Sequence, residues 1–269
     1  MVKQPVVTEL PPKKSPGAIL SDEVKEGVDA LERSSSGLFV SGVSAGLELG
    51  LSLLLIAIVR TKSDGSLPPT LDALLLASMY SFGFIVVVLG RSELFTEQTT
   101  LAILPLRAGR TTFKKVARLW GLVYAGNLLG AAICPALFVL IAPALHIAER
   151  ETFVRIASEV LAFPAWVFVL SGVLAGWLMG LVSWGVAAAR DSIGQIVTIW
   201  MITSVIGLGH LHHSVLGFAE VVGGVYAGGD FAWGELVGFQ CCTTLGNAVG
   251  GGCFVALLKH GHAGAQTPA

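Results

Sequence analysis

Six long apolar runs constrain this chain of 269 residues more than any other feature. They occupy 37–59, 71–106, 119–145, 162–189, 196–229 and 236–258. A helix needs about 20 apolar residues to cross the hydrocarbon layer of a membrane, which is about 30 Å thick. Charged residues make up 13% of the chain, whereas they make up about a quarter of a soluble domain. The sequence therefore predicts an all-α integral membrane protein.

Two of these runs are too long and too interrupted for one straight helix. The run 71–106 would be about 54 Å long at 1.5 Å per residue, and Gly90–Glu93 and Thr96–Gln98 interrupt it. The run 196–229 is interrupted by polar and glycine residues at 207–214. Two crossings would need about 40 apolar residues, which neither run has. Irregular backbone is tolerated at membrane depth where protein or a water-filled cavity satisfies its polar groups. We therefore expect six transmembrane helices, of which crossings 2 and 5 are broken.

The positive side chains favour one orientation of these crossings. With the N-terminus inside, 12 Lys and Arg residues fall on inner segments, 4 fall on outer loops, and Arg91 lies within the membrane. Because inner loops are rich in Lys and Arg, both termini are expected in the cytoplasm, with the protein in the inner membrane of a bacterium. The predicted parts are a cytoplasmic N-terminal segment at 1–36, a transmembrane channel domain at 37–258 and a cytoplasmic tail at 259–269.

The N-terminal segment contains one predicted helix. Val24, Val28 and Leu31 recur at helical spacing, which predicts an amphipathic helix at the surface over Ser21–Arg33. Its N-cap is expected at Ser21 or Asp22, because these side chains can accept a hydrogen bond from the first turn.

The two halves of the apolar region repeat the same order of motifs. Gly126-Asn127-Leu128-Leu129-Gly130 in the third crossing corresponds to Gly246-Asn247-Ala248-Val249-Gly250 in the sixth. Ser44-Ala45-Gly46 in the first crossing corresponds to Leu174-Ala175-Gly176 in the fourth. Three crossings per half place the halves in opposite orientations, as in inverted-repeat transporters. We therefore expect two inverted three-helix repeats whose broken helices face each other.

A histidine at the second break is the strongest candidate for a functional group. His213 lies in an apolar run, where an ionisable side chain costs about 2.5–3.5 kcal/mol on insertion scales. It is either a buried side chain satisfied by a backbone carbonyl or a titratable group that lines a pore. With His210 and His212 it also forms a cluster that suggests a metal site. No Cys or carboxylate is close by in sequence, so no metal is expected.

The first break carries two acidic residues, Glu93 and Glu97. They either bind backbone N–H groups of the loop or belong to a pathway through the membrane, and the sequence favours neither interpretation. Arg91 is expected to pair with one of them or to reach the membrane surface. Glu48 and Glu220 are expected to form hydrogen bonds between helices.

These motifs together resemble those of the formate/nitrite transporter family. The resemblance covers about residues 37–258 and rests on Glu93-Leu94-Phe95-Thr96, His213-Ser214-Val215 and the two Gly-Asn motifs. It implies an aquaporin-like protomer and a homopentamer with one pore in each subunit. It also implies a central histidine between two apolar constrictions.

The resemblance also assigns roles to individual residues. The pore is expected to contain a histidine, a threonine that faces it and a polar residue of the last helix, which are here His213, Thr96 and Asn247. Tyr80 and Phe84 are expected to form the apolar constriction of one half, and Ile206 that of the other. The two loops are expected to be supported by Glu93, Phe95 and Ser214.

The chain departs from the family pattern at four places. The family's Ser-x-Ala-Asn after the pore histidine is here Ser214-Val215-Leu216-Gly217. His212, which we count among the pore residues, stands where the family has Glu. Glu159 and Val160 occupy the stretch where a vestibule Lys is expected. Gly176 replaces a usual Asn. The missing Lys weakens the capture of an anion, so the transported solute of this chain can differ from that of its relatives.

A weak-acid pathway also follows from the physics of the constriction. An anion between Phe84 and Ile206 loses its water without replacement, whereas its neutral acid avoids most of that cost. His213 can supply a positive partner or a proton. The sequence therefore predicts passive or proton-coupled passage of a small monovalent anion and its conjugate acid, such as formate or nitrite. A channel for a small neutral solute is the alternative, and a membrane metalloprotein built on the histidine cluster is a less favoured one.

Other function classes are not expected. The net charge of −1 offers no field that attracts nucleic acid, and the chain has no G-x-x-x-x-G-K-[ST] loop for ATP-driven transport. The four Cys lack the spacing of metal ligands. We expect no enzyme activity and no cofactor. The expected partners are the small anion or acid, membrane lipid and further copies of the chain.

Overall fold

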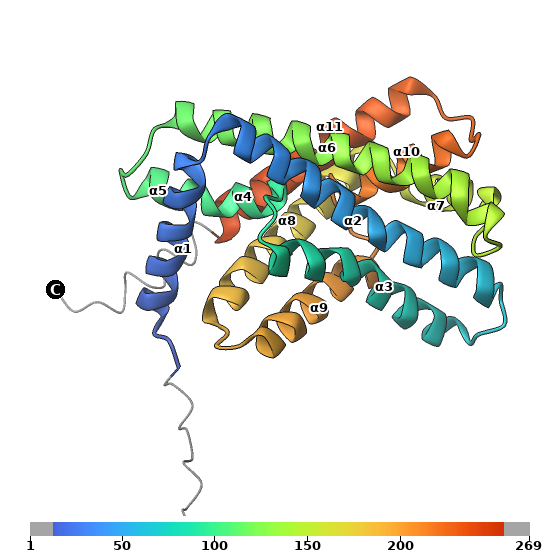
Figure 1. Ribbon diagram of the computed structural model, residues 1–269, viewed down its shortest axis with the longest axis horizontal. Helices are drawn as coiled ribbons and strands as arrows, with labels where there is room; N and C mark the ends of the chain where they lie inside the picture. The colour runs from blue at the N-terminus through green and yellow to red at the C-terminus, as the bar shows by residue number, and fades with distance from the viewer. Residues whose placement is uncertain (1–12, 256–269) are drawn as a thin grey trace, which may run out of the picture.

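The computed structural model describes residues 13–255, and every regular element in that range is helical (Figure 1). The elements are α1 (Pro16–Glu32), α2 (Ser35–Ser63), α3 (Pro69–Gly90), α4 (Phe95–Leu101), α5 (Ile103–Arg107), α6 (Phe113–Ala144), α7 (Arg150–Leu161), α8 (Ala165–Ala188), α9 (Ser192–Leu208), α10 (Leu216–Tyr226), α11 (Trp233–Val249) and the π-helix η1 (Gly250–Val255). The predicted tail at 259–269 lies outside the described residues, as do the first residues of the predicted N-terminal segment.

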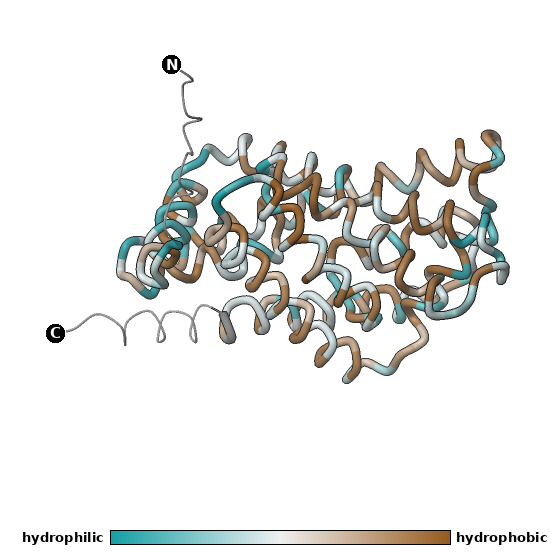
Figure 2. Tube along the Cα trace, turned by 90° about the horizontal axis from the view of Figure 1, so that it is seen from below, coloured by the Kyte–Doolittle hydropathy of each residue, from teal (hydrophilic) through white to brown (hydrophobic). Residues whose placement is uncertain are grey.

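Four of these helices are long and apolar enough to cross a membrane. They are α2, α3, α6 and α8, with 29, 22, 32 and 24 residues. The shortest of them is about 33 Å long at 1.5 Å per residue, which matches the hydrocarbon layer. The helices α9 and α10 are apolar but have only 17 and 11 residues. Figure 2 shows hydrophilic residues gathered at the end of the molecule where α1 and α5 lie, while hydrophobic residues dominate along the long helices.

Glycines bring the backbones of two helix pairs into contact. Gly46 of α2 faces the carbonyl oxygen of Asn127 on α6, and Gly176 of α8 faces the carbonyl oxygen of Asn247 on α11. A Cβ atom at either glycine would overlap that oxygen, so a larger residue requires the helices to move apart. The small-residue motifs of the sequence thus meet the Gly-Asn motifs in space, in both halves of the chain.

The two interrupted runs each fold as more than one helix. In the run 71–106, the first loop (residues 91–94) separates α3 from α4. In the run 196–229, the second loop (residues 209–215) separates α9 from α10. Arg91 and His210 have φ angles of 57° and 49°, in the left-handed region. Arg91 directly follows the end of α3, and His210 lies two residues after the end of α9. The left-handed turn prevents the helix from continuing.

The N-terminal helix differs from its prediction in its start and in its surroundings. It begins at Pro16 instead of Ser21, because Ser15 is the N-cap and its Oγ accepts a hydrogen bond from the N–H of Ala18 at 3.2 Å. The expected cap at Ser21 or Asp22 is therefore wrong. The helix packs on protein, with Gly27 against the backbone of Leu101 in α4. Sequence analysis also missed α7, an amphipathic helix that buries Phe153 and Ile156.

A carboxylate lies on the packing face of α1. Glu23 is 1% exposed, and neither of its carboxyl oxygens has a hydrogen-bond partner among the described residues. Burial raises the pKa of Glu23 well above its ordinary value, and the negative charges of Glu26, Glu97 and Asp22 raise this pKa further. The docked position of α1 therefore favours the protonated carboxyl group.

We expect the docking of α1 to weaken as pH rises above the ordinary pKa of Glu, about 4.3. Below that pH the carboxyl group is protonated both in the docked and in the released helix, and docking is strongest. At higher pH, docking must keep the proton or bury the charge. Hydrogen exchange of the α1 amides, corrected for intrinsic rates, should show faster opening at higher pH. Glu23→Gln should flatten this dependence, and an identical dependence in parent and variant would contradict the explanation.

Candidate permeation pathway

The first loop is held by one asparagine of α6. The backbone N–H of Phe95 donates to Oδ1 of Asn127 at 2.8 Å. The Nδ2 atom of Asn127 donates to the carbonyl oxygens of Gly42 and Glu93 at 2.9 and 2.8 Å. Asn127 is completely buried. Its amide thus satisfies one N–H and one C=O group that the interrupted helices leave free, at Phe95 and Glu93, and also binds the Gly42 carbonyl inside α2.

The second loop is held in the same way by an asparagine of α11. The backbone N–H of Ser214 donates to Oδ1 of Asn247 at 2.8 Å. The Nδ2 atom of Asn247 donates to the carbonyl oxygens of Gly172 and His212 at 2.9 and 3.0 Å. Asn247 is also completely buried. Its side chain is directed to the backbone of the loop.

The two loops bring Thr96 and His213 together from opposite halves of the chain. Oγ1 of Thr96 lies 2.8 Å from Nε2 of His213. On the other side of the ring, Nδ1 accepts hydrogen bonds from the backbone N–H groups of Val215 and Leu216 at 3.3 and 3.2 Å. Because a backbone N–H can only donate, Nδ1 carries no proton in this arrangement. The neutral ring therefore donates from Nε2 to Thr96.

Apolar side chains surround this hydrogen bond. The ring of Phe84 meets the ring of His213 edge-on, with 4.9 Å between the centroids. Tyr80 stacks on Phe84 at 5.5 Å. Ile206 is completely buried, as is Phe84, and together with Tyr80 it lines the cavity that leads to His213. Tyr80 and Ile206, which the resemblance assigns to the constrictions of different halves, thus line the same cavity on one side of His213.

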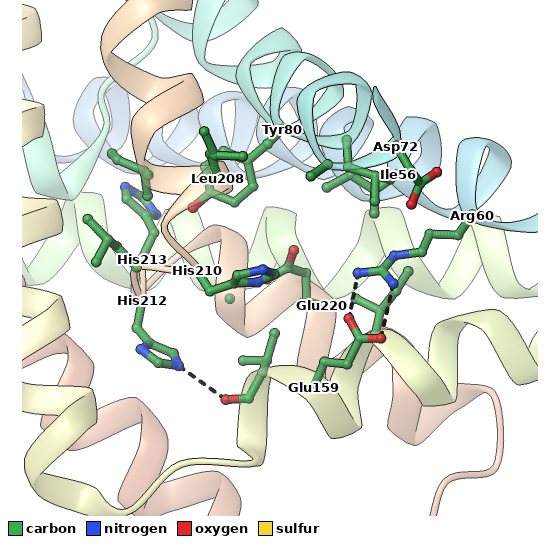
Figure 3. Close-up of a pocket in the computed structure, with 18 of the residues that line it drawn as sticks. Ile56, Arg60, Asp72, Tyr80, Glu159, Leu208, His210, His212, His213 and Glu220 are labelled. Atoms are coloured by element: carbon green, nitrogen blue, oxygen red, sulfur yellow. Dashed lines mark hydrogen bonds and ion pairs between the residues drawn. The ribbon is translucent and has the colours of Figure 1, made fainter. Parts of the chain in front are cut away.

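The His213 cavity opens on this side (Figure 3). It has a volume of about 440 Å³ and is lined by residues of α2, α3, α7, α9, α10 and the second loop. Arg60 is the one Lys or Arg among the described residues that line it, and it binds both carboxyl oxygens of Glu159, at 3.1 and 2.5 Å. Glu159 stands in the stretch where the family has a Lys, so an acid has replaced the expected cation and pairs with an arginine from another helix. Sequence analysis missed Arg60.

A second cavity, the α1 cavity, lies between α1 and the first loop. It has a volume of about 820 Å³, and Glu93 and Glu97 line it. Glu93 pairs with Arg33 at 2.6 Å and accepts a hydrogen bond from Gln98. Arg91 pairs with Glu26 of α1 at 3.5 Å. Of the two alternatives expected for Arg91, the pairing with Glu93 or Glu97 is wrong, because α1 covers this loop and supplies Glu26 instead. The side chain of Arg91 is 76% exposed, as the other alternative requires.

The histidine cluster does not converge on one point. Nδ1 of His212 lies 2.5 Å from Oγ of Ser171, and Nε2 lies 3.2 Å from the carbonyl oxygen of Val160. Figure 3 shows the rings of His210, His212 and His213 pointing in different directions. Within residues 13–255, no three His, Cys, Asp or Glu side chains are placed to hold a metal ion together.

Further contacts brace the two loops. Phe95 packs against the ring of Tyr124 at a centroid distance of 4.7 Å. The hydroxyl of Tyr124 accepts a hydrogen bond from Nε2 of Gln240, which also donates to the carbonyl oxygen of Ser214 at 2.9 Å. This link joins both loops through α6 and α11. Sequence analysis missed Tyr124 and Gln240, although their position near the Gly-Asn motifs was a usable signal.

Glu48 forms hydrogen bonds within its own helix and to the first loop, whereas bonds to another helix were expected. Its Oε1 accepts hydrogen bonds from Ser44 at 2.7 Å and from Ser92 at 3.0 Å, and the second of these joins α2 to the first loop. No hydrogen bond to the Glu220 side chain comes from the described residues. That side chain lines the His213 cavity instead.

Comparisons with known proteins agree with the resemblance. The family model described as formate/nitrite transporter matches residues 18–261. The inner membrane protein YfdC of Escherichia coli is 34% identical over 244 residues, which are 88% of this chain and 75% of that protein. Among solved structures, an FNT family ion channel superposes with a TM-score of 0.81 at 22% identity and covers 93% of this chain and 99% of its own. A pentameric formate channel with formate bound has a TM-score of 0.72 at 23% identity, with 83% and 95% covered.

Replacement of Asn247 by Leu should destabilise the protein without changing the size of the side chain much. It leaves the Ser214 N–H and the His212 carbonyl group of the loop without the partner that Asn247 supplies, and each such group costs about 1–3 kcal/mol. We expect a fall of at least about 5 °C in the unfolding temperature in detergent, at about 2–4 °C per kcal/mol. Leu245→Ala, at a position 59% exposed on the same helix, is the control. Equal unfolding temperatures in both variants would contradict the role of Asn247.

Proposed function

Because the chain belongs to the formate/nitrite transporter family, we propose that it is a membrane channel for a small monovalent anion and its conjugate weak acid. The observation that carries the proposal is the hydrogen bond between His213 and Thr96, surrounded by apolar side chains and located between two cavities. A polar group at the centre of an apolar path is what a weak acid needs in order to pass as a neutral molecule.

We propose six crossings in two inverted repeats. In this arrangement α2, α6, α8 and α11 each cross once, while α3 with α4 and α9 with α10 form the two interrupted crossings. The equivalent contacts of Asn127 and Asn247 support it, because each asparagine satisfies the break in its own half. The excess of Lys and Arg on one side favours cytoplasmic termini, and the relative YfdC favours the inner membrane.

The proposed mechanism depends on the charge of the solute at the constriction. An anion that passes Tyr80, Phe84 and Ile206 loses its hydration, and these side chains do not replace it. The Nε2–H of His213 can leave Thr96 and donate to an oxygen of the solute. The negative charge of that solute favours a second proton on the ring, which has to displace the N–H groups of Val215 and Leu216 from Nδ1. The charged ring is then a positive partner for the anion and a source of the neutralising proton. Asn247 takes part by positioning the second loop.

A channel for a small neutral solute is the second candidate. It is favoured by the ion pair of Arg60 with Glu159, which leaves the His213 cavity without an unpaired permanent cation among its described residues. Flux into proteoliposomes decides between the two: formate and nitrite should outpace neutral solutes of similar size if the channel is for weak acids. Faster flux of the neutral solutes would favour the second candidate.

We also propose a homopentamer, as in the pentameric formate channel that shares the fold. The protomer exposes large apolar side chains on α6 and α8, among them Leu140 at 65% and Trp166 at 66%, which must face lipid or another copy. Native mass spectrometry in mild detergent is expected to show five chains. A stable monomer or dimer would overturn this part of the proposal.

Phe84→Ala should widen the path and remove part of the apolar barrier. We expect flux to rise severalfold and discrimination between small and larger weak acids to fall, while the oligomeric state stays the same. Leu74→Ala on the same helix, 50% exposed and outside the lining of both cavities, is the control. If Phe84→Ala leaves the rates of differently sized solutes unchanged, Phe84 serves packing alone.

His213→Phe should lower weak-acid flux by about 10–100-fold, because a hydrogen bond to a charged group contributes about 1.5–3 kcal/mol. His213→Asn keeps a polar side chain that cannot titrate. We expect the residual flux of the His213→Asn variant to lose the pH dependence between about pH 5 and 8 that titration of an imidazole produces. The measurement is the initial rate of formate uptake by proteoliposomes over this range.

His212 requires a parallel test because it lies next to His213 and lines the same cavity. The double replacement of His212 and His213 is therefore measured beside each single one. If the double variant conducts like the parent with the same pH profile, the central-histidine mechanism is wrong for this chain.

A further inference from the structure

A buried acid in the His213 cavity has no role in the mechanism above. Glu220 lies on α10, one turn after its start, and is 8% exposed. Its carboxyl group lines the cavity, and none of the described residues donates a hydrogen bond to it. In Figure 3, Glu220 lies between the histidines on one side and the ion pair of Arg60 with Glu159 on the other.

The charged and titratable groups around Glu220 in this cavity come from three helices and the second loop, while α9 contributes none. They are Arg60 of α2, Asp72 and Tyr80 of α3, Glu159 of α7, and His210, His212 and His213 of the second loop. Both carboxyl oxygens of Glu159 already bind Arg60. Glu220 therefore has no cation of its own, and an ionised Glu220 would add a negative charge to a cavity that already holds two other carboxylates.

Such a carboxyl group is more stable with a proton than without one, because burial without a hydrogen-bond donor penalises the charged form. The neutral group places a proton in a cavity that extends to His213. An anion in this cavity is repelled by an ionised Glu220 but can accept a hydrogen bond from a protonated one.

We propose that Glu220 is a proton-loading group, which protonates the weak-acid anion in the His213 cavity before the anion reaches the constriction. This inference rests on the proposed channel function. In the step, the O–H bond of the Glu220 carboxylic acid breaks and an O–H bond forms on the anion, so that a carboxylate and a neutral acid result. A hydronium ion in the water that enters the cavity returns a proton to the carboxylate and leaves as neutral water.

The geometry separates the tasks of the two groups. Glu220 faces the cavity, where water can reload it, whereas His213 is 1% exposed and bonded to Thr96. A proton acquired in the cavity allows the solute to enter the apolar section already neutral. The histidine then orients the neutral acid and stabilises those solute molecules that arrive as anions.

The test is Glu220→Gln, which has nearly the same shape but cannot supply an acid proton. Initial rates of formate uptake by proteoliposomes should fall at least about tenfold near pH 7, less than the about 100-fold that a positioned proton donor contributes to a chemical step. The loss should shrink towards pH 5, where more solute arrives already protonated. Glu151→Gln, an exposed acid of α7 outside the cavity, is the matched control and should match the parent.

Infrared spectroscopy of the reconstituted protein provides a readout that a structural role would not produce. The parent should show the C=O band of a protonated carboxylic acid near neutral pH, and Glu220→Gln should lack it. Glu220→Asp, which keeps an acid on a shorter side chain, should retain a shifted band and part of the flux. The Glu220→Asp variant and the band of the parent test the proton-loading role even if Glu220→Gln does not fold.

The outcomes distinguish this inference from the channel proposal. If Glu220→Gln keeps the pH profile of the parent, or if the parent lacks a band that depends on Glu220, the proton-loading role is wrong while the channel proposal stands. If the parent passes no weak acid at all, the channel proposal fails and the inference fails with it.

Discussion

The bonds from two asparagine amides to loop backbone make the rest of this structure possible. A helix that stops inside a membrane leaves N–H and C=O groups that lipid cannot satisfy. Asn127 and Asn247 each offer one acceptor and one donor group with two hydrogens, and each binds one N–H and two C=O groups. Ser and Thr cannot do this, because a hydroxyl has a single hydrogen to donate. The glycines of α2 and α8 are part of the same solution, since the carbonyls of Gly42 and Gly172 are within reach only where the helices touch.

These bonds also determine where the chemistry lies. Thr96 directly follows Phe95, whose N–H donates to Asn127. His213 lies between His212 and Ser214, whose C=O and N–H groups bind Asn247. The 2.8 Å contact of Thr96 with His213 therefore depends on both halves of the chain at once. A shift in either loop would break it, which is why the polar link through Tyr124 and Gln240 between the loops supports the same geometry.

Features that depend on local sequence could be predicted, and features that depend on distant partners could not. The apolar runs, their interruptions and the repeated Gly-Asn motifs follow from composition and spacing, so the all-helical fold was accessible. The roles of Thr96, Phe84 and Ile206 came from the family resemblance, since no spacing rule joins residues over 100 positions apart. Arg91 was paired with the wrong acid because α1 approaches the first loop only in the folded chain. The Arg60–Glu159 pair was missed for the same reason, and α7 because its apolar face is short.

The charges of the His213 cavity indicate how a channel of this kind can select a weak acid without attracting it. A free cation at the mouth would raise the local concentration of any small anion, including strong-acid anions that never become neutral. In this chain the arginine of the cavity is bound to Glu159, so that attraction is reduced. The cavity also contains the apolar side chains beside His213, which disfavour a charged solute, and it contains groups that can hold a proton, such as Glu220. Under the proposed mechanism, the solute is selected by its ability to accept a proton, and anions of strong acids are excluded because they do not accept one.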